Sequence, residues 1–147
     1  MANRNTAGFG LIAAGTVGST PATQGQGKYF IDAGYTDDLF QGCSVRAKNG
    51  YIVEASSTRT FATIGVLNGI FYNDASTKKP TFANFYNQPI TPANSEDITA
   101  FVLDNPFQLF VGATSAAVTQ ANVGRTVSFA AAVPTGSTIS GQCSNTL

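Results

Sequence analysis

Residues 61–74 read FATIGVLNGIFYND, an apolar run that ends in a turn signal at Asn73 and Asp74. Successive side chains of a β-strand point to opposite faces. Both faces of this stretch are then apolar, with Ile64, Val66, Ile70 and Tyr72 on one and Leu67 and Phe71 on the other. A strand that is apolar on both faces belongs at the centre of a packed β domain. We therefore predict the central strand of the fold here.

Two glycines interrupt this predicted strand. Glycine inside a strand usually marks a β-bulge, a bend at a barrel corner, or the close approach of another backbone. Asn68 precedes Gly69, so the sequence predicts a bulge at this pair. Gly65 marks the second point at which the strand is expected to bend or to meet another backbone.

Turn signals divide much of the remaining chain into short strands. Asn49-Gly50, between residues 39–47 and 51–54, predicts a β-hairpin. The turn residues Asp104-Asn105-Pro106 predict a second hairpin between residues 98–103 and 107–111. Three further elements are expected: strands at Lys28–Ile31, Thr126–Phe129 and Ile139–Thr146. Residues 114–124 carry potential N-cap residues and a terminal glycine, which predict one short helical turn.

Together these signals predict an all-β fold: a single small barrel or sandwich of about seven or eight strands over residues 28–147. Residues 1–27 lack sustained periodicity and are predicted as an extended N-terminal arm. Phe9, Leu11 and Ile12 form an apolar cluster within it. We expect this cluster to dock on a partner or neighbouring subunit by strand addition; the alternative is a disordered tail.

A long irregular connection between Asn73 and Glu96 contains the aromatic residues Phe82, Phe85 and Tyr86. Long loops in compact domains are usually functional or pack on themselves. These three rings are therefore candidate interface anchors. The alternative is that they cover one end of the barrel.

The composition favours a protein that is covered by partners. Hydrophobic residues make up 43% of the 147 residues and charged residues only 11%, against roughly 25% charge in ordinary soluble domains. The net charge is zero, which argues against nucleic-acid binding. Long apolar runs and a signal peptide are both missing, so we expect no membrane span and a product that stays in the cytosol where it is made.

Cys43 and Cys143 are the only cysteines. A disulfide between them would close a loop of about 100 residues and contribute about 4–5 kcal/mol in the chain-entropy model. Cytosolic synthesis instead favours two reduced, partly buried thiols. The sequence leaves both states open, and the compartment argument favours the reduced one.

The chain contains no histidine and no tryptophan. Without histidine it lacks the commonest general base and metal ligand, so we expect no catalytic residues, no metal site and no cofactor. The acidic pairs Asp37-Asp38 and Glu96-Asp97 have a turn-like context. They are interpreted as solvated turn residues rather than calcium ligands, because no alternating Asp/Asn ligand loop is present.

A series of short motifs occurs in a fixed order and spacing at residues 64–72, 79–82, 98–106, 122–124, 136–138 and 140–141, with weaker ones at residues 8–9 and 28–31. In this order and spacing, the motifs resemble the small head decoration (cement) proteins of tailed bacteriophages. The resemblance covers most of the chain. Relatives in that family often continue past the segment matching residues 141–147 with a further apolar strand region. This sequence contains no such region.

The resemblance implies a β-tulip-like protein that binds the outer surface of the expanded phage capsid. Such proteins assemble as homotrimers on the major capsid protein and stabilise the head against internal DNA pressure. Their implied location is the virion, after synthesis in the bacterial cytoplasm. The family carries no catalytic residues that could be transferred to this chain.

Two other functions remain as alternatives from the residues themselves. One is a carbohydrate-binding β module on a virion or cell surface, with Tyr35, Tyr51, Phe82 and Tyr86 as stacking platforms. The other is a hydrolase built on paired carboxylates, for which Asp37 and Glu96 are the candidates.

Overall fold

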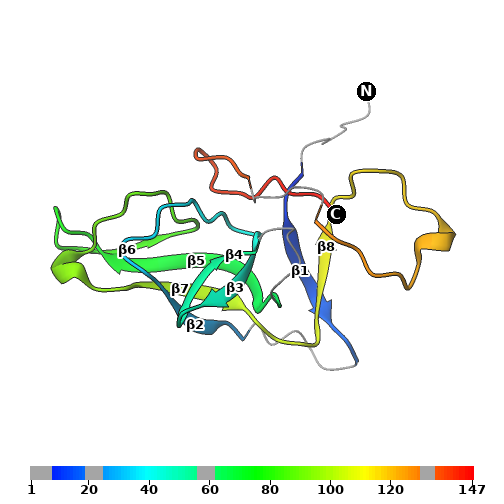
Figure 1. Ribbon diagram of the computed structural model, residues 1–147, viewed down its shortest axis with the longest axis horizontal. Coiled ribbons are helices and arrows are strands. Elements are labelled where there is room, and N and C mark those ends of the chain that lie inside the picture. The colour runs from blue at the N-terminus through cyan, green and yellow to red at the C-terminus, as the bar shows by residue number, and fades with distance from the viewer. Residues whose placement is uncertain (1–7, 19–24, 56–61, 130–134) are drawn as a thin grey trace.

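The computed structural model describes residues 8–18, 25–55, 62–129 and 135–147. In these residues, eight strands form two antiparallel sheets of two and six strands. The same residues contain no α-helix, only the two short 3-10 turns η1 (Ala93–Ser95) and η2 (Gln120–Asn122). Figure 1 shows the smaller sheet beside one end of the larger one, with its strands running across the larger sheet's strands. The prediction of an all-β fold is confirmed.

The six-stranded sheet, called the main sheet here, has the strand order β2-β7-β5-β3-β4, with β6 also paired to β5. Its strands are β2 (Gly27–Ile31), β3 (Ser44–Lys48), β4 (Tyr51–Glu54), β5 (Gly65–Asn73), β6 (Pro80–Ala83) and β7 (Ile98–Leu103). The edge strands β2 and β4 do not pair with each other. The main sheet therefore stays open rather than closing into a barrel.

β5 is the central strand, as predicted. It pairs with β7 along one edge, and with β3 and then β6 along the other. The register with β7 shifts between Leu67 and Gly69, which confirms the predicted bulge. A Cβ on Gly65 would lie 2.2 Å from the carbonyl oxygen of Leu103, so this glycine allows close approach of β7.

The core lies on one face of the curled main sheet. Ile31, Leu67, Ile70, Ile98 and Val102 are almost completely buried and form its centre. Because of the bulge, Leu67 and Ile70 both point into this core, whereas simple alternation assigned them to opposite faces. Phe71 lies on the outer face and is 36% exposed.

The β3–β4 hairpin matches its prediction. Lys48 pairs with Tyr51 across the two turn residues, and Asn49 and Gly50 have φ values of 53° and 87°. Positive φ at both central residues is the geometry that Asn-Gly favours in a hairpin turn. Regular strand structure begins only at Ser44, later than the predicted Leu39, and the preceding residues form isolated bridges.

The second predicted hairpin is wrong. A turn does follow β7, but β7 pairs with β2 and β5, while β8 (Gln108–Gly112) pairs with β1 (Leu11–Thr16). Both edges of β7 are already occupied, so its neighbour in sequence cannot add to it. The chain therefore leaves the main sheet at residues 104–107 and enters the smaller one.

The smaller sheet, called the ribbon here, consists of β1 and β8. Residues 11–16 of the predicted N-terminal arm thus pair within their own chain, from Leu11 opposite Gly112 to Thr16 opposite Gln108. The backbone N–H of Leu11 also donates a hydrogen bond to the carbonyl of Gly42 at 2.8 Å. Residues 1–7 and 19–24 of the predicted arm lie outside the described residues.

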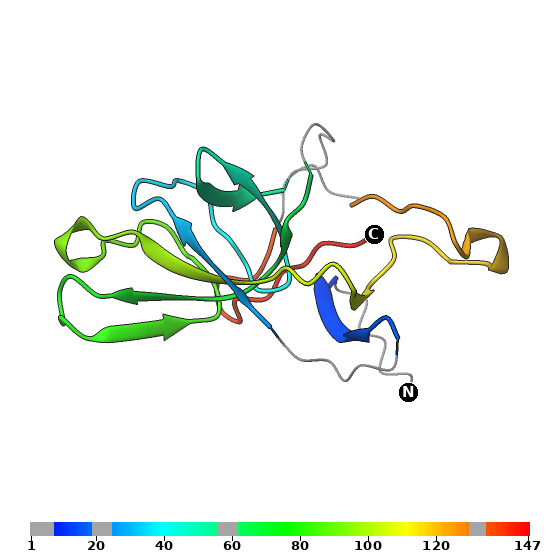
Figure 2. The same ribbon diagram turned by 90° about the horizontal axis from the view of Figure 1, so that it is seen from below.

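Residues 113–129 form a long loop that extends away from both sheets (Figures 1 and 2). The predicted helical turn is reduced here to η2, capped by Thr119 rather than by Thr114 or Ser115. The strands predicted at Thr126–Phe129 and Ile139–Thr146 are wrong. Residues 126–129 are irregular, and the C-terminal segment makes only isolated bridges, such as Gln41 with Gln142.

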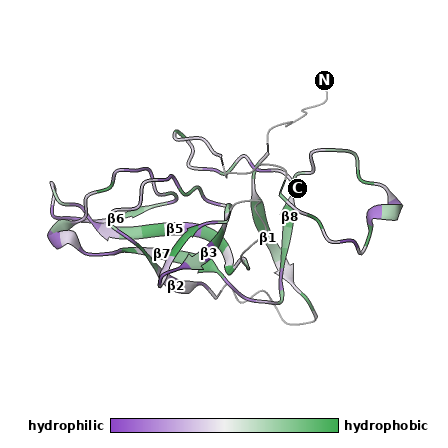
Figure 3. Ribbon diagram, viewed as in Figure 1, coloured by the Kyte–Doolittle hydropathy of each residue, from purple (hydrophilic) through white to green (hydrophobic). Residues whose placement is uncertain are grey.

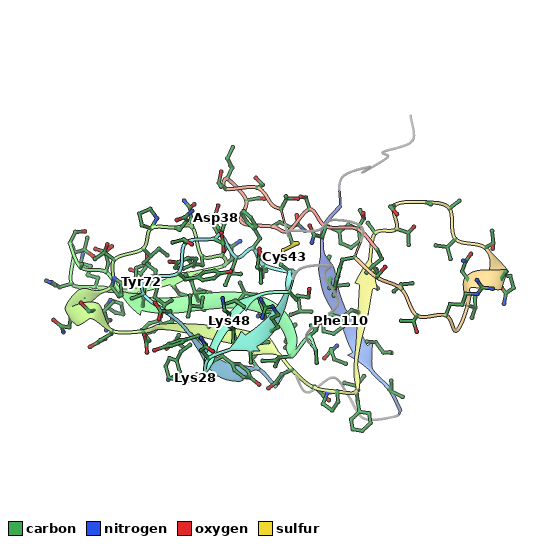
Figure 4. The ribbon with its side chains drawn as sticks, viewed as in Figure 1. Lys28, Asp38, Cys43, Lys48, Tyr72 and Phe110 are labelled. Atoms are coloured by element: carbon green, nitrogen blue, oxygen red, sulfur yellow. A yellow bond between two sulfur atoms is a disulfide. The ribbon has the colours of Figure 1, made fainter. Side chains whose placement is uncertain are left out.

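The C-terminal segment joins the two sheets. Cys143 is bonded to Cys43, with a Cα–Cα distance of 5.5 Å, so the expectation of two reduced thiols is wrong. The backbone N–H of Gly10 donates to the carbonyl of Asn145, and that of Leu147 donates to Ala113. Figure 4 shows Cys43 and the sulfur atoms between the main sheet and the ribbon.

Candidate functional site

The ribbon presents an apolar face to solvent. Ile12 pairs with Val111, and Leu109 lies two positions before Val111 on β8, so these three side chains share one face. Val17 and Phe107 continue that face, since the N–H of Val17 donates to the carbonyl of Phe107 at 2.8 Å. The exposed fractions are 50% for Ile12, 60% for Val17, 63% for Phe107, 48% for Leu109 and 53% for Val111. We call these five residues the ribbon face (hydropathy in Figure 3).

The loop of residues 113–129 extends this exposed surface. Every residue from Thr114 to Ser128 is exposed, and Val118, Val123 and Val127 are each at least 60% exposed. The loop nevertheless has internal structure. The side chain of Asn122 accepts hydrogen bonds from the backbone N–H and the hydroxyl of Thr119 at 3.0 and 2.9 Å.

A second apolar surface lies on the outer face of the main sheet. Phe30 pairs with Thr99, Thr99 with Phe71, and Phe71 with Phe82, so these four side chains form one row across four strands. The rings of Phe82 and Phe101 lie 5.8 Å apart. Phe82 is 64% exposed. We call the row formed by Phe30, Thr99, Phe71 and Phe82 the phenylalanine row.

The first three predicted interface residues lie together. Phe9, Leu11 and Ile12 all line a cleft of about 320 Å³ between the ribbon and the main sheet. Uncharged residues complete its lining, among them Gln41 and Val66. Phe9 and Leu11 are partly covered by the fold itself, whereas Ile12 also belongs to the exposed ribbon face.

The other three predicted residues have three different environments. Phe82 is exposed in the phenylalanine row. Phe85 is half-buried and stacks on Phe40 at 5.8 Å, beside the disulfide. Tyr86 is completely buried in the core, and its hydroxyl donates to the carbonyl of Tyr35 at 2.8 Å. Tyr86 therefore has no surface for a partner, which corrects its selection as an interface anchor.

Two of the four predicted carbohydrate platforms come together. Tyr35 and Tyr51 line a cleft of about 500 Å³ beside the β3–β4 hairpin, together with Asp32, Asp37, Lys48 and Asn49. We call it the Tyr35–Tyr51 cleft. Phe82 lies on the outer face of the main sheet and Tyr86 in the core, so neither contributes to it.

Both tyrosine hydroxyls in this cleft stay protonated well above neutral pH. Burial is the main cause that raises the pKa of Tyr35 to about 12. The pKa of Tyr51 is raised chiefly by its hydrogen bond to Asp97, to which its hydroxyl donates at 3.2 Å. The two rings are therefore neutral aromatic surfaces rather than sources of negative charge.

The two candidate carboxylates of a hydrolase lie apart. Asp37 lines the Tyr35–Tyr51 cleft, whereas Glu96 does not. The Glu96 carboxylate instead accepts a hydrogen bond from Asn73 at 3.4 Å. Asp38 accepts a hydrogen bond from the backbone N–H of Gln88 at 2.9 Å, so its carboxylate holds a segment 50 positions away in the sequence.

Sequence reasoning missed most of the ribbon face, namely Val17, Phe107, Leu109 and Val111. Phe107–Val111 was predicted as a strand, but pairing it with residues 98–103 placed it inside a hairpin of the main domain. The usable signal was the combination of apolar residues at alternate positions with a complete lack of charge in residues 107–112. Which strand they pair with depends on contacts far apart in the sequence.

Comparisons of this chain with protein-family models, with curated proteins and with solved structures found no match. In the part of the chain that the structure describes, no group of three or more potential metal-ligating Cys, Asp or Glu residues is present. No helix among the described residues is long and apolar enough to cross a membrane. The features that bear on function are therefore the exposed ribbon face, the phenylalanine row and the clefts.

Proposed function

We propose that this protein is a structural virion protein that binds the outer surface of the expanded phage capsid as a decoration, or cement, protein. In this role it stabilises the head against internal DNA pressure and performs no catalysis. The observation that carries the proposal is the ribbon face, with five large apolar side chains that are each about half exposed or more.

A two-stranded ribbon with an uncovered apolar face is poorly stable by itself in water. Fully burying a Val, Leu, Ile or Phe side chain is worth roughly 1.5–3 kcal/mol, and about half of that remains available at half-exposed positions. Covering the ribbon face would therefore stabilise both the ribbon and the complex. Such a contact suits a permanent assembly better than a reversible encounter.

The proposed partners are the major capsid protein and two further copies of the chain in a homotrimer. A trimer would present three ribbons at once, so that weak individual contacts combine into tight attachment through effective concentration. Selective binding to the expanded lattice would stabilise that lattice by mass action. The phenylalanine row offers a separate surface for contacts between subunits.

The disulfide fits the proposed location on the virion. Disulfides persist in oxidising surroundings and are rare in bacterial cytosol. The bond between Cys43 and Cys143 gives a weak indication of such surroundings. A virion protein is made in the cytoplasm but functions outside the cell, where a buried bridge would survive.

Co-sedimentation with expanded, decoration-free heads of the encoding phage tests the proposal, with unexpanded proheads as the comparison. We expect saturable binding to expanded heads alone. The ribbon and its flanking residues Val17 and Phe107 contain no charged residue. Binding should therefore change little between low and high salt, because screening acts on charges. Failure to bind either head form would reject the proposal.

The double variant Leu109→Ser, Val111→Thr tests the ribbon face itself. It makes two exposed positions polar, and we expect head affinity to fall at least about tenfold, the equivalent of 1.4 kcal/mol. Ile139→Ser is the matched control, because Ile139 is 97% exposed outside the ribbon. Equal binding by both variants would show that attachment uses another surface. Deleting residues 1–27 is less informative, since it also removes β1, to which β8 pairs.

A further inference from the structure

The Tyr35–Tyr51 cleft has features that attachment to a capsid does not require. Its volume of about 500 Å³ lies within the roughly 300–1,000 Å³ typical of small-molecule sites. It lies against the β3–β4 hairpin of the main sheet, and none of the ribbon residues lines it. The cleft is therefore a separate surface of the molecule.

The fold holds the ring of Tyr35 from several sides. The carboxylate of Asp32 accepts the backbone N–H of Gly34 at 2.7 Å, and the Asp32 carbonyl accepts that of Tyr35 at 3.0 Å. The Tyr35 hydroxyl accepts the N–H of Glu54 at 3.2 Å, and its ring lies 6.0 Å from the buried ring of Tyr86. Tyr35 is thus a preorganised aromatic surface.

Tyr51 is positioned by the hairpin turn and by Asp97. It begins β4 directly after the Asn49-Gly50 turn, and its hydroxyl donates to the Asp97 carboxylate at 3.2 Å. The hydroxyls of both tyrosines are thereby engaged with protein groups. What the two residues offer a ligand is chiefly their apolar ring surface.

Polar side chains border these rings. Among the described residues, Asp37, Lys48 and Asn49 form no side-chain hydrogen bond. They supply a carboxylate acceptor, an ammonium donor and an amide that can do both. Fixed aromatic surfaces bordered by uncommitted donors and acceptors match a ligand that has apolar C–H faces and many hydroxyl groups.

We infer that the Tyr35–Tyr51 cleft binds a neutral oligosaccharide. The sugar C–H faces would pack on the two rings, and its hydroxyls would donate to Asp37 and accept from Lys48 and Asn49. The lining carries charges of both signs, which favours a neutral ligand. An anionic ligand would meet the carboxylates of Asp32 and Asp37, and a cationic one would meet the Lys48 ammonium as well as those carboxylates.

This site is independent of the proposed attachment to heads. The two functions are compatible only if the cleft faces outward on the particle. A Tyr51 variant should therefore sediment with expanded heads like the unchanged protein. Failure of head binding would leave the saccharide site standing, and failure of saccharide binding would leave the attachment proposal standing.

The test is isothermal titration calorimetry of the full chain with neutral hexasaccharides of glucose, galactose and N-acetylglucosamine. The glucosamine hexamer is the charged comparison, because it differs from the N-acetylglucosamine hexamer only in lacking the acetyl groups. We expect saturable binding of at least one neutral hexamer. Tighter binding of the cationic hexamer than of every neutral one would overturn the assignment, as would no binding at all.

Substitutions locate the site. Tyr51→Ala should raise the Kd of the bound hexamer at least about tenfold, the loss expected for an anchoring aromatic ring. Tyr51→Phe keeps the ring and should change the Kd little. Phe82→Ala removes an exposed ring from the outer face of the main sheet and serves as the control. Lys48→Ala, at an exposed position, provides a second loss-of-binding variant if Tyr51→Ala fails to fold. Unchanged binding by both would place the ligand elsewhere and reject the inference.

Discussion

Glu54 carries a carboxyl group in an unfavourable environment. One of its oxygens, Oε2, is buried and has no hydrogen-bond partner among the described residues. Burial raises the pKa of Glu54 above its usual value of 4.5, and the nearby charge of Asp37 adds to that increase while Arg46 opposes it. The folded protein therefore holds the Glu54 proton more tightly than the unfolded chain does.

The sign of this pKa shift gives a pH-dependent prediction. The stability linked to protonated Glu54 is present below its unfolded pKa and is lost as pH rises through the higher folded pKa. Glu54→Gln removes the charge, so the variant should unfold at a higher temperature than the unchanged protein at pH 8 and at a similar one at pH 3.5.

The expected gain at pH 8 is small, about 0.5 kcal/mol, because solvent screens a partly exposed carboxylate. Thermal unfolding followed by circular dichroism measures it. Glu96→Gln, at an exposed turn position, is the control and should give no comparable gain. A variant that is less stable than the unchanged protein at pH 8 would show that the Glu54 charge is stabilising.

At the scale of single residues, the sequence identified apolar side chains but not the side of the sheet on which each one lies. Tyr86 and Phe82 occur four residues apart in the same proline-containing connection, yet one is fully buried and the other is 64% exposed. The bulge at Asn68 likewise changes which face of the main sheet the later residues of β5 occupy. Burial is decided by packing between distant segments, which local patterns do not encode.

The β3–β4 hairpin gives a prediction at the scale of one element. Gly50 has a φ of 87°, and a Cβ added there would meet no atom within 4 Å. Gly50→Ala should therefore cost only the backbone strain of an L-residue in the left-handed region, about 1–2 kcal/mol. The same variant should loosen the Tyr35–Tyr51 cleft, because its lining residues Lys48 and Tyr51 flank this turn and Asn49 belongs to it.

Gly15→Ala is a matched control for the loss of stability expected of Gly50→Ala. A Cβ on Gly15 would also meet nothing within 4 Å, but its φ lies outside the left-handed region. It should leave the free energy of unfolding unchanged or raise it by up to about 1 kcal/mol through the unfolded chain. Urea unfolding compares the two variants. Equal effects would mean that backbone conformation at Gly50 is not what stabilises the hairpin.

Elements fixed by local chemistry were predictable, and elements fixed by distant pairing were not. The Asn49-Gly50 turn and the two-sided apolar pattern of β5 carry their own physical causes, and both predictions were confirmed. The pairing of β1 with β8 joins residues that lie far apart in the sequence, such as Leu11 and Gly112, and the turn after β7 resembles a hairpin turn locally. Only the occupied edges of β7 show that β8 must pair elsewhere.

At the scale of the whole molecule, the C-terminal segment connects parts that the two sheets do not connect themselves. Cys143 is bonded to Cys43 just before β3, Asn145 accepts a hydrogen bond from Gly10 before β1, and Leu147 bonds to residues following β8. The ribbon is thus fastened to the main sheet through this segment. Within the described residues, the disulfide is the covalent bond that attaches the C-terminal segment to the main sheet.

Reduction of the disulfide should therefore destabilise the whole molecule. The bridge spans 100 residues, so its loss is expected to lower the free energy of unfolding by about 4–5 kcal/mol in the chain-entropy model. Freeing the C-terminal segment should also loosen the ribbon and weaken head binding. Urea unfolding and head co-sedimentation, each with and without a phosphine reductant, measure the two effects.

The number of free thiols shows whether Cys43 and Cys143 are bonded to each other. Both cysteines are 1% exposed, so thiols must be counted in denaturant, where we expect none before reduction and two after it. The double variant Cys43→Ser, Cys143→Ser controls for other actions of the reductant, which should leave its stability unchanged. Two thiols counted before reduction would show that the chain is not bridged. An unchanged urea midpoint after complete reduction would show instead that hydrogen bonds alone hold the C-terminal segment. The position of the ribbon would then depend on the backbone hydrogen bonds from Leu11 to Gly42, from Gly10 to Asn145 and from Leu147 to Ala113.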